Sequence, residues 1–462
     1  MSHLYLHGFG VRYGLPVPLA LYLYAAGAVV VVSFVLVVLF ARGRVGEHAT
    51  DYPRREARWL VALGNAVVVR FLSGLVGVLS LLLVIVAGFI GSQTANQNPE
   101  AYLVWIYFWA STVILTGLIG NFWTYLNPFT TIYRLLARVL PHGTRRLPDW
   151  LGIWPAGALY FAFAWLELAS GQASHPAVVA GLATAYTAVT VGGMLVYGER
   201  AWLERCEMFT VLLTIVARFG PIETERDESG RLLKAWLRPW GTGLLAPVKA
   251  GWDYVVFVIL MLSSLAFDGV IGTGFWNDTV TSPTGPFGSS FGTWSDPVQH
   301  TIGLVGLTVL FLLVFVVFMN AVAWLGASRA ATLPILTTFA LTLVPIALVY
   351  NAAHNYTYVT VTSQGILPAL SDPFGRGWHL LPVSAAFTPS VIFAQAVTVW
   401  YAQLVLIVLG HVIAVYLAHL RAGESFKKAQ AVLVSQYPML ILMVGYTMTS
   451  LWILAQPITS GG

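Results

Sequence analysis

Charged side chains are scarce in this sequence, and their scarcity excludes a water-soluble protein. Asp, Glu, Lys and Arg make up 9% of the 462 residues, and hydrophobic residues make up 58%. An ordinary soluble domain carries about 25% charged residues. Apolar runs of about 20 residues, long enough to cross a bilayer, recur along the chain. The composition therefore predicts an all-α integral membrane protein that crosses the lipid bilayer several times.

Cysteine is almost absent from the sequence, and several common catalytic motifs are missing. Cys206 is the only cysteine, which excludes an internal disulfide and any zinc or iron–sulfur site built from several cysteines. The chain contains no GxxxxGK[ST] phosphate-binding motif and no HExxH zinc motif. Its basic residues lie in short loops between apolar runs, where they orient a protein in its membrane. We therefore expect no nucleic-acid partner.

Ten apolar runs are long enough to be membrane spans, and the connections between them alternate in charge. Lys and Arg gather in every second connection, which the positive-inside rule assigns to the cytoplasm. We therefore expect a single domain, residues 1–462, that is a multi-pass protein of the plasma (cytoplasmic) membrane with both termini extracytoplasmic. Its longest connections are a cytoplasmic loop, 198–250, and two extracytoplasmic loops, 269–300 and 354–385. The ten predicted spans are residues 17–40, 67–90, 101–120, 150–169, 177–197, 252–268, 302–325, 333–353, 390–418 and 433–456.

Two further apolar segments do not fit this pattern. Residues 206–219 are too few to span, so they are expected to form a helix that is interfacial, re-entrant or packed among the other helices. Residues 120–140 follow a span without a polar loop, and Pro128 must break or kink any helix through them. Broken helices of this kind line cavities in transporters. The alternative is a helix that ends at the membrane surface.

Histidine and aspartate side chains gather on the predicted extracytoplasmic side. Imidazole and carboxylate groups are ligands of zinc, copper and iron, so a site for a divalent transition metal is one hypothesis. Solvated or hydrogen-bonded loop residues are the alternative, because no spacing typical of metal ligands is present. The residues are His3, His7, His175, His300, His354, His379, Asp268, Asp278, Asp296 and Asp372.

Two other ionisable residues lie inside predicted spans. Glu167 is about one turn inside the outer end of its span, where an unpaired carboxylate is costly, so it is a functional candidate. Reaching out to the membrane surface is the alternative. His411, in GHVIAVYLAH, lies deep in the span 390–418, with Gln403 on roughly the same face, whereas His419 is expected at the cytoplasmic surface among lipid headgroups. His411 is then a hydrogen-bonded packing residue, a step in a proton path, or a metal or haem ligand.

Several blocks of sequence, taken together, show a distinctive order and spacing: HGFGVRYGLPVPL (7–19), GNFWTYLNPF (120–129), ERAWLERCEMFTVLLTIVARFGP (199–221), LAFDGVIGTGFW (265–276), SDPFGRGW (371–378) and GHVIAVYLAH (410–419). They resemble a family of polytopic bacterial membrane proteins called fenitrothion hydrolases. The resemblance implies phosphotriester hydrolysis, which normally uses a metal-activated water. The family pattern has Asp at Gly14 and a second histidine at Asn351, so the chain departs from it at two positions.

These observations favour one function and leave two alternatives open. The favoured one is metal-assisted hydrolysis of an ester-like small molecule in an outward-facing cavity, with His354, Asp268 and Asp372 as catalytic candidates and His7 and His354 as metal ligands. The first alternative is a proton-coupled transporter of a small solute, with Glu167 and His411 on the proton path. The second is a membrane subunit of a metal or haem redox complex.

Overall fold

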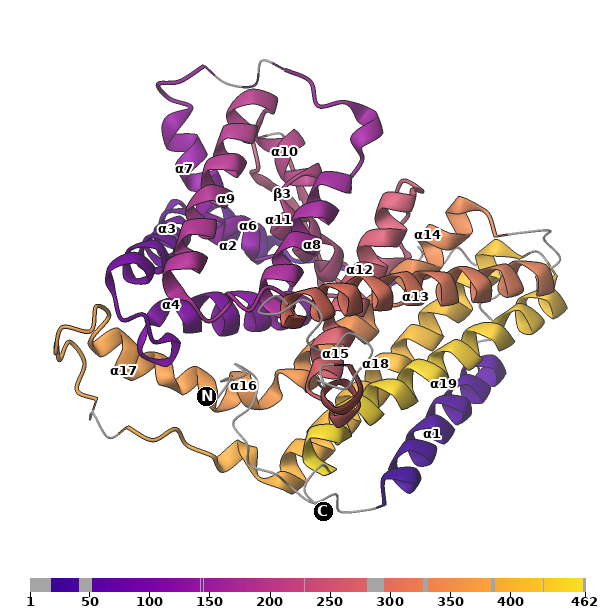
Figure 1. The fold of residues 1–462 in the computed structure, drawn as a ribbon. Coiled ribbons are helices and arrows are strands. Elements are labelled where there is room, and N and C mark those ends of the chain that lie inside the picture. Colours follow the sequence, from indigo (N-terminus) through magenta and orange to yellow (C-terminus); the bar gives the residue numbers. More distant parts are fainter. Residues whose placement is uncertain are drawn as a thin grey trace.

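The computed structural model describes residues 18–40, 52–141, 143, 145–227, 229–280, 295–326, 331–383, 387–426 and 428–459. These residues form a helical protein with one small sheet (Figure 1). Within them, nine segments are long and apolar enough to cross a membrane, which confirms the all-α polytopic class. Each segment is one helix or a run of two or three consecutive helices. They are α1 (Leu19–Phe40), α3 (Val67–Ile90), α4–η3–α5 (Pro99–Ala101, Tyr102–Ser111, Thr112–Leu118), α9 (Pro176–Tyr197), α12 (Trp252–Ile271), α13 (Ser295–Leu325), α14–α15 (Leu333–Leu341, Val344–His354), α18 (Ala396–Ser425) and α19 (Ala429–Thr459).

One of the ten predicted spans, residues 150–169, is instead a shorter helix. α8 (Trp154–Leu168) has 15 residues. At 1.5 Å per residue it is about 22 Å long, less than the roughly 30 Å of a hydrocarbon core. Pro155 lies in its first turn, where the missing N–H costs nothing. Because α8 packs against α11 and α12, part of its length is enclosed by protein.

The spans form two groups that meet at α12 and α15. α3 packs against α9 on one side of the molecule, and α1, α18 and α19 pack against one another on the other side (Figure 1). α12 touches α8, α13, α14 and α15, and α15 packs closely along α18. α12 and α14–α15 are also the most buried of the spans. The centre of the molecule is therefore formed by helices that are shielded from lipid.

Helix α18 approaches α15 closely at a glycine. A Cβ atom at Gly410 would lie 2.2 Å from a methyl group of Val349 and 3.1 Å from the carbonyl oxygen of Pro345. Only a residue without a side chain fits at this contact. Gly410 therefore sets the distance between the two helices next to His411.

Two short helices begin with the same kind of cap. Pro128 breaks the segment 120–140 as predicted: α6 ends at Leu126, and the Asn127 side chain accepts hydrogen bonds from the N–H groups two and three residues later. Glu207 caps α11 in the same way. The two caps are neighbours, because the Asn127 amide donates to the Thr210 hydroxyl at 3.3 Å. The backbone groups freed by these breaks thus find protein partners.

The predicted cytoplasmic loop contains a β-hairpin that the sequence analysis did not foresee. β2 (Ile222–Arg226) and β3 (Leu232–Leu237) pair antiparallel, and β1 (Arg55–Glu56) extends the sheet beside β3. β3 is mostly apolar, and within it Leu232 and Ala235 are buried. Gly230 adopts a left-handed conformation in the connection. The short helix predicted for 206–219 is confirmed as α11.

Two predicted outer loops are also partly helical. α13 begins at Ser295 rather than at residue 302, and the region 354–385 contains α16 and α17. The remaining elements are α2 (Arg58–Asn65), η2 (Ala95–Gln97), α6 (Trp123–Leu126), α7 (Pro128–Leu136), η4 (Asp149–Leu151), α10 (Glu199–Arg205), α11 (Met208–Ala217), η5 (Thr242–Leu245), η6 (Trp276–Val280), α16 (Tyr356–Thr360), η8 (Thr362–Gly365), α17 (Ile366–Ser371) and η9 (Ile392–Ala394).

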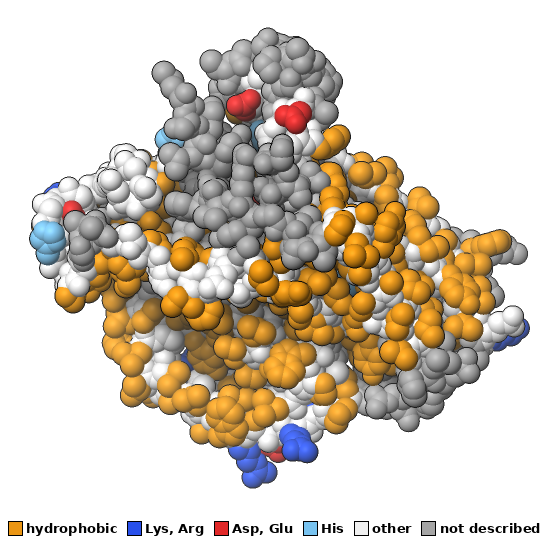
Figure 2. Space-filling view, turned by 90° about the horizontal axis from the view of Figure 1, so that it is seen from below, with side chains coloured by type: hydrophobic (Ala, Val, Ile, Leu, Met, Phe, Trp, Pro, Cys, Tyr) orange, Lys and Arg blue, Asp and Glu red, His pale blue; other side chains and the backbone are white. Residues whose placement is uncertain are grey.

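The outside of the bundle is strongly apolar. Figure 2 shows hydrophobic side chains over most of the described surface of one face, with Lys and Arg only near its edges. α3 and α13 leave most of their length exposed, including Phe71, Leu79 and Leu313. A soluble monomer rarely exposes apolar patches of more than a few hundred Å². Such a surface fits a lipid bilayer as its solvent.

Candidate functional site

Asp268 and His354 form an ion pair inside the bundle. The Oδ2 atom of Asp268 lies 2.9 Å from the Nε2 atom of His354, and the side chains are only 7% and 16% exposed. Asp268 lies in the last turn of α12, and His354 is the last residue of α15. The Tyr350 ring stacks on the His354 ring, one turn earlier in α15. Two of the three predicted catalytic residues therefore meet, at the end of the bundle that the charge pattern predicts to be extracytoplasmic.

Glu167 joins this pair from a third helix. It is the penultimate residue of α8, close enough to Asp268 for their charges to interact, and it is hydrogen-bonded to the Trp109 side chain. Trp109 belongs to η3, a π-helix of ten residues between α4 and α5. π-Helical segments are rare and often occur at functional sites. Here the π-helix places Trp109 inside the bundle, facing α8.

Tyr358 and Glu100 extend the cluster, and neither is among the site residues predicted from the sequence. The Tyr358 hydroxyl interacts electrostatically with Glu167, Asp268 and Glu100. Glu100 is the second residue of the span 99–118 and is only 1% exposed, and its Oε1 atom has no hydrogen-bond partner among the described residues. The signal in the sequence is the position of Glu100, an acidic residue at the start of an apolar run on the predicted outer side. We call Glu100, Glu167, Asp268, His354 and Tyr358 the acidic cluster.

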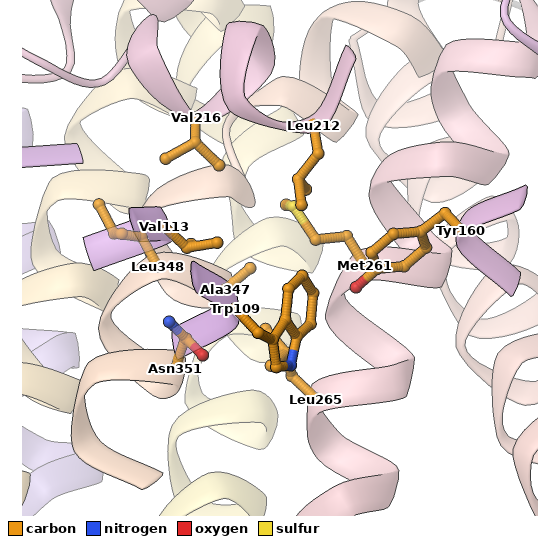
Figure 3. Close-up of a pocket in the computed structure, with 10 residues that line it drawn as sticks. All are labelled: Trp109, Val113, Tyr160, Leu212, Val216, Met261, Leu265, Ala347, Leu348 and Asn351. Carbon is orange, nitrogen blue, oxygen red and sulfur yellow. The ribbon is translucent and has the colours of Figure 1, made fainter. Parts of the chain in front are cut away.

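A small cavity lies next to the acidic cluster, deeper in the bundle. Its volume is about 10 Å³, which is about the space that one water molecule needs. Figure 3 shows the Trp109 indole, the Tyr160 hydroxyl and the Asn351 amide among its apolar lining. Tyr160 and Asn351 lie on α8 and α15, two turns and one turn before Glu167 and His354. Polar groups of the cavity thus follow the acidic cluster inward along the same helices.

The described residues fit a metal ion only in part. A catalytic zinc site uses three protein ligands and a water. Asp268 and His354 would supply two, but no group of three His, Cys, Asp or Glu side chains with metal-binding geometry occurs in the described part of the chain. His7, the other predicted metal ligand, lies outside the described residues. A metal centre at Asp268 and His354 therefore stays a prediction.

Asp372, the third catalytic candidate, is used in its own loop. Its carboxylate accepts hydrogen bonds from the backbone N–H groups of Arg376 at 2.8 Å and Gly377 at 2.7 Å. Desolvation raises the pKa of Asp372, and backbone hydrogen bonds lower it by more, so that this pKa lies below its usual value. Both hydrogen bonds lie within the loop that follows α17. Its position is that of a loop-stabilising residue.

His411 is completely buried in α18. Its Nδ1 atom lies 2.7 Å from the carbonyl oxygen of Ile407, and its Nε2 atom has no hydrogen-bond partner in the part of the chain that the structure describes. Gln403, expected to share a polar face with it, donates instead to the carbonyl oxygen of Ala353, next to His354. Among the described residues no second histidine bonds to His411. A bis-histidine haem site therefore finds no support in this part of the chain.

His419 is enclosed by protein and does not face lipid headgroups, contrary to the prediction from the sequence. It is 4% exposed, and its Nδ1 atom lies 2.7 Å from the Oε1 atom of Gln436 in α19. The reason is that α18 continues to Ser425. Arg421, one turn before the end of α18, is also buried and donates to the carbonyl oxygens of Leu244 and Leu245.

Fold and site together define an all-α, multi-pass membrane protein with buried acidic and imidazole groups at the ends of three packed helices. No family model, no curated protein and no solved structure matches this chain. The resemblance to fenitrothion hydrolases therefore stays an expectation from the sequence blocks.

Proposed function

We propose that this protein is a proton-coupled transporter of a small solute, and that the acidic cluster binds and releases the coupled proton. The observation that carries this proposal is the Asp268–His354 pair at 2.9 Å beside the carboxylate of Glu167. Ionisable residues within membrane spans are costly and rare, and chains of Asp, Glu and His there mark proton relays. Two neighbouring carboxylates in a low dielectric repel each other when both are ionised. One proton moving into or out of the cluster therefore changes its energy strongly.

The surrounding helices support the same proposal. α14 ends at Leu341 and α15 begins at Val344, so this span is interrupted near its middle. The span 99–118 contains the π-helix η3, and α6–α7 and α10–α11 are broken at Asn127 and near Glu207. Discontinuous helices near the membrane midplane form the substrate and ion sites of many transporters. The acidic cluster takes residues from two of these interrupted spans.

Proton movement into liposomes tests the proposal. The purified protein is reconstituted with pyranine inside, and a potassium gradient with valinomycin drives protons inward, first in buffer and then with panels of amino acids, organic acids and sugars outside. We expect faster acidification than in empty liposomes, and its loss in Asp268→Asn. The matched control is Asp296→Asn, an exposed acidic residue in the first turn of α13. Equal rates for Asp268→Asn and the wild-type protein would overturn the proposal.

Metal-assisted hydrolysis of an ester-like substrate is the second candidate. In its favour, Asp268 and His354 meet, and a carboxylate with an imidazole is part of a common zinc ligand set. The sequence blocks that resemble fenitrothion hydrolases point the same way. Elemental analysis of the purified protein and phosphotriester hydrolysis by wild-type and His354→Ala protein test this candidate. Absence of a stoichiometric metal together with unchanged hydrolysis in His354→Ala would rule it out.

A further inference from the structure

The acidic cluster carries more negative charge than its one imidazole can balance. His354 pairs with Asp268 at 2.9 Å, and this pair is neutral overall when the imidazole is protonated. Glu100 and Glu167 interact with no Lys, Arg or His side chain within the part of the chain that the structure describes. An ionised carboxylate at membrane depth is costly unless a positive charge accompanies it. The cluster therefore requires a further positive charge, either a proton or a bound cation.

Two uncharged side chains beside the ion pair also present oxygen atoms without hydrogen bonds. Gln403 is 7% exposed, and its amide nitrogen donates to the backbone carbonyl one residue before His354. Tyr350 is 2% exposed, and its ring stacks on the His354 ring. Its hydroxyl is directed at α12 next to Asp268, because a Cβ atom at Gly269 would lie 2.3 Å from it. Among the described residues, neither this hydroxyl nor the Gln403 Oε1 atom has a hydrogen-bond partner. Both atoms therefore mark a place where a ligand that donates hydrogen bonds would be stabilised.

The space beside the cluster limits the size of such a ligand. The cavity of about 10 Å³ lies one turn inside Asp268 and His354, since Leu265 and Asn351 belong to its lining. Its volume is about that of one water molecule. Glu167 and His354 are partly exposed, so a small ligand can reach the cluster from the end of the bundle predicted to be extracytoplasmic. An ammonium ion has a single non-hydrogen atom, as water has, and fits such a space.

The chemistry around the cluster favours a cation that donates hydrogen bonds. Carboxylate, amide and phenol oxygens all accept hydrogen bonds, so the N–H groups of an ammonium ion match them. Aromatic rings also border the carboxylates: the Trp109 side chain is hydrogen-bonded to Glu167, and Tyr350 and Tyr358 lie beside the ion pair. The faces of such rings attract cations. An anion would instead be repelled by the carboxylates.

We propose that the acidic cluster binds an ammonium ion between Glu167 and Asp268, in exchange for the proton that the cluster otherwise holds. The ion donates hydrogen bonds to the two carboxylates and to the Gln403 amide oxygen. The carboxyl O–H bond breaks and its proton passes to water, while the N–H bonds of the ion stay intact. Proton and ammonium bring the same charge, so the cluster is balanced in both states. That ammonium is the transported solute rests on the proposed function, in which this cluster releases the coupled proton.

Proton release on addition of ammonium tests the exchange in detergent solution. The purified protein, weakly buffered with a pH-indicating dye, receives ammonium chloride at matched pH and ionic strength, over a series of pH values. Choline chloride supplies a cation that is too large for the site. We expect ammonium to release up to one proton per chain in a saturable manner and choline to release none. Glu167→Gln should abolish the release, and Asp296→Asn, an exposed acidic control, should keep it. Equal release by choline, or no release by ammonium at any pH, would overturn the proposal.

The hydrogen bonds to the ion are tested by one variant and one further cation. We expect Gln403→Leu to raise the ammonium concentration for half-maximal release about tenfold, without changing the number of protons released, because one bond to a charged donor is lost. An unchanged concentration would contradict the position of the ion beside Gln403. Potassium has no N–H groups, so we expect it to need a concentration at least about tenfold higher than ammonium. Equal potency of the two ions would overturn the assignment to a hydrogen-bonding cation.

The pyranine liposomes separate this inference from the proposed function. If Asp268→Asn abolishes proton flux while ammonium releases no proton from the wild-type protein, the ammonium site is wrong and the proposed transporter stands. If ammonium releases a proton while wild-type liposomes acidify no faster than empty ones, the ammonium site is supported and proton-coupled transport is wrong. The two assays are independent, because proton release in detergent requires no flux across a bilayer.

Discussion

Replacing either member of the Asp268–His354 pair should cost more than replacing both. The Asp268 Oδ2 and His354 Nε2 atoms are 2.9 Å apart, and both side chains are charged when the imidazole is protonated. With an effective dielectric constant of about 20, their attraction is about 6 kcal/mol before the cost of desolvation is subtracted. Removing one partner of a buried pair leaves the other without compensation and typically costs about 3–5 kcal/mol, whereas replacing both by apolar residues is often nearly neutral. We therefore expect Asp268→Leu and His354→Leu each to lose about 3–5 kcal/mol, and the double variant to lose less than either.

The assay is unfolding in mixed detergent micelles of increasing SDS content, followed by tryptophan fluorescence. The matched control is Glu204→Gln, which removes the exposed pair that Glu204 forms with Arg200 at 2.8 Å. That pair is expected to contribute only about 0.3–0.5 kcal/mol, because water screens it. Additive losses in the Asp268→Leu/His354→Leu double variant would show that the two side chains do not depend on each other, and would refute the buried-pair description.

Four further predictions concern helix caps, helix packing, a loop carboxylate and metal removal. Glu207→Ala should cost more stability than Asn127→Ala, about 2–4 against about 1–2 kcal/mol in the same unfolding assay, because Glu207 also accepts hydrogen bonds from two partly buried hydroxyl groups. Equal losses would contradict this. Gly77→Ala should prevent α3 from docking, since its Cβ would lie 1.8 Å from the Leu126 carbonyl oxygen, and the variant should melt earlier than the wild-type protein. The pKa of Asp372 is lowered by the amide groups of its loop, so the stabilisation of the loop by this carboxylate is complete above about pH 3.9 and is lost as the pH falls below that value. Hydrogen exchange of the loop amides should therefore show protection at neutral pH and loss of protection in acid. In Asp372→Ala the protection should be lost at all pH values. Dialysis against EDTA should leave the melting temperature and the proton flux unchanged, and a fall in both would favour the metal-assisted hydrolase.

The sequence predicts the spans well because their signal is local. Val67–Ile90 contains a single charged residue, Arg70, near one end, so both its length and its type are readable. Pro128 lacks a backbone N–H and disfavours a helical conformation before it, and the structure has a helix break at this position. α8 is harder, since its 15 helical residues and the turns beside them read together as one run of spanning length. The hairpin β2–β3 was not predicted because β2 is rich in charged residues and β3 lacks the regular alternation of polar and apolar residues that indicates a strand.

The site is less predictable because it depends on contacts between distant segments. Glu167 and Asp268 stand out individually, as carboxylates near the ends of apolar runs, but nothing local indicates that they lie together. Trp109 reaches Glu167 through a π-helix, which has no clear sequence signal. The position predicted for His419 was wrong because Arg421, two residues later, suggests a membrane boundary. In the structure Arg421 lies inside the protein and donates hydrogen bonds to backbone carbonyl groups of η5.

The most direct question is whether the acidic cluster takes up a proton within the membrane. Infrared difference spectroscopy of the reconstituted protein between neutral and acidic pH measures this through the C=O stretch of protonated carboxyl groups. We expect a band that is lost or strongly reduced in Asp268→Asn or Glu167→Gln and unchanged in Asp296→Asn. Difference spectra that are identical in the carboxyl region for the wild-type protein, Asp268→Asn and Glu167→Gln would contradict a proton-binding role for this site.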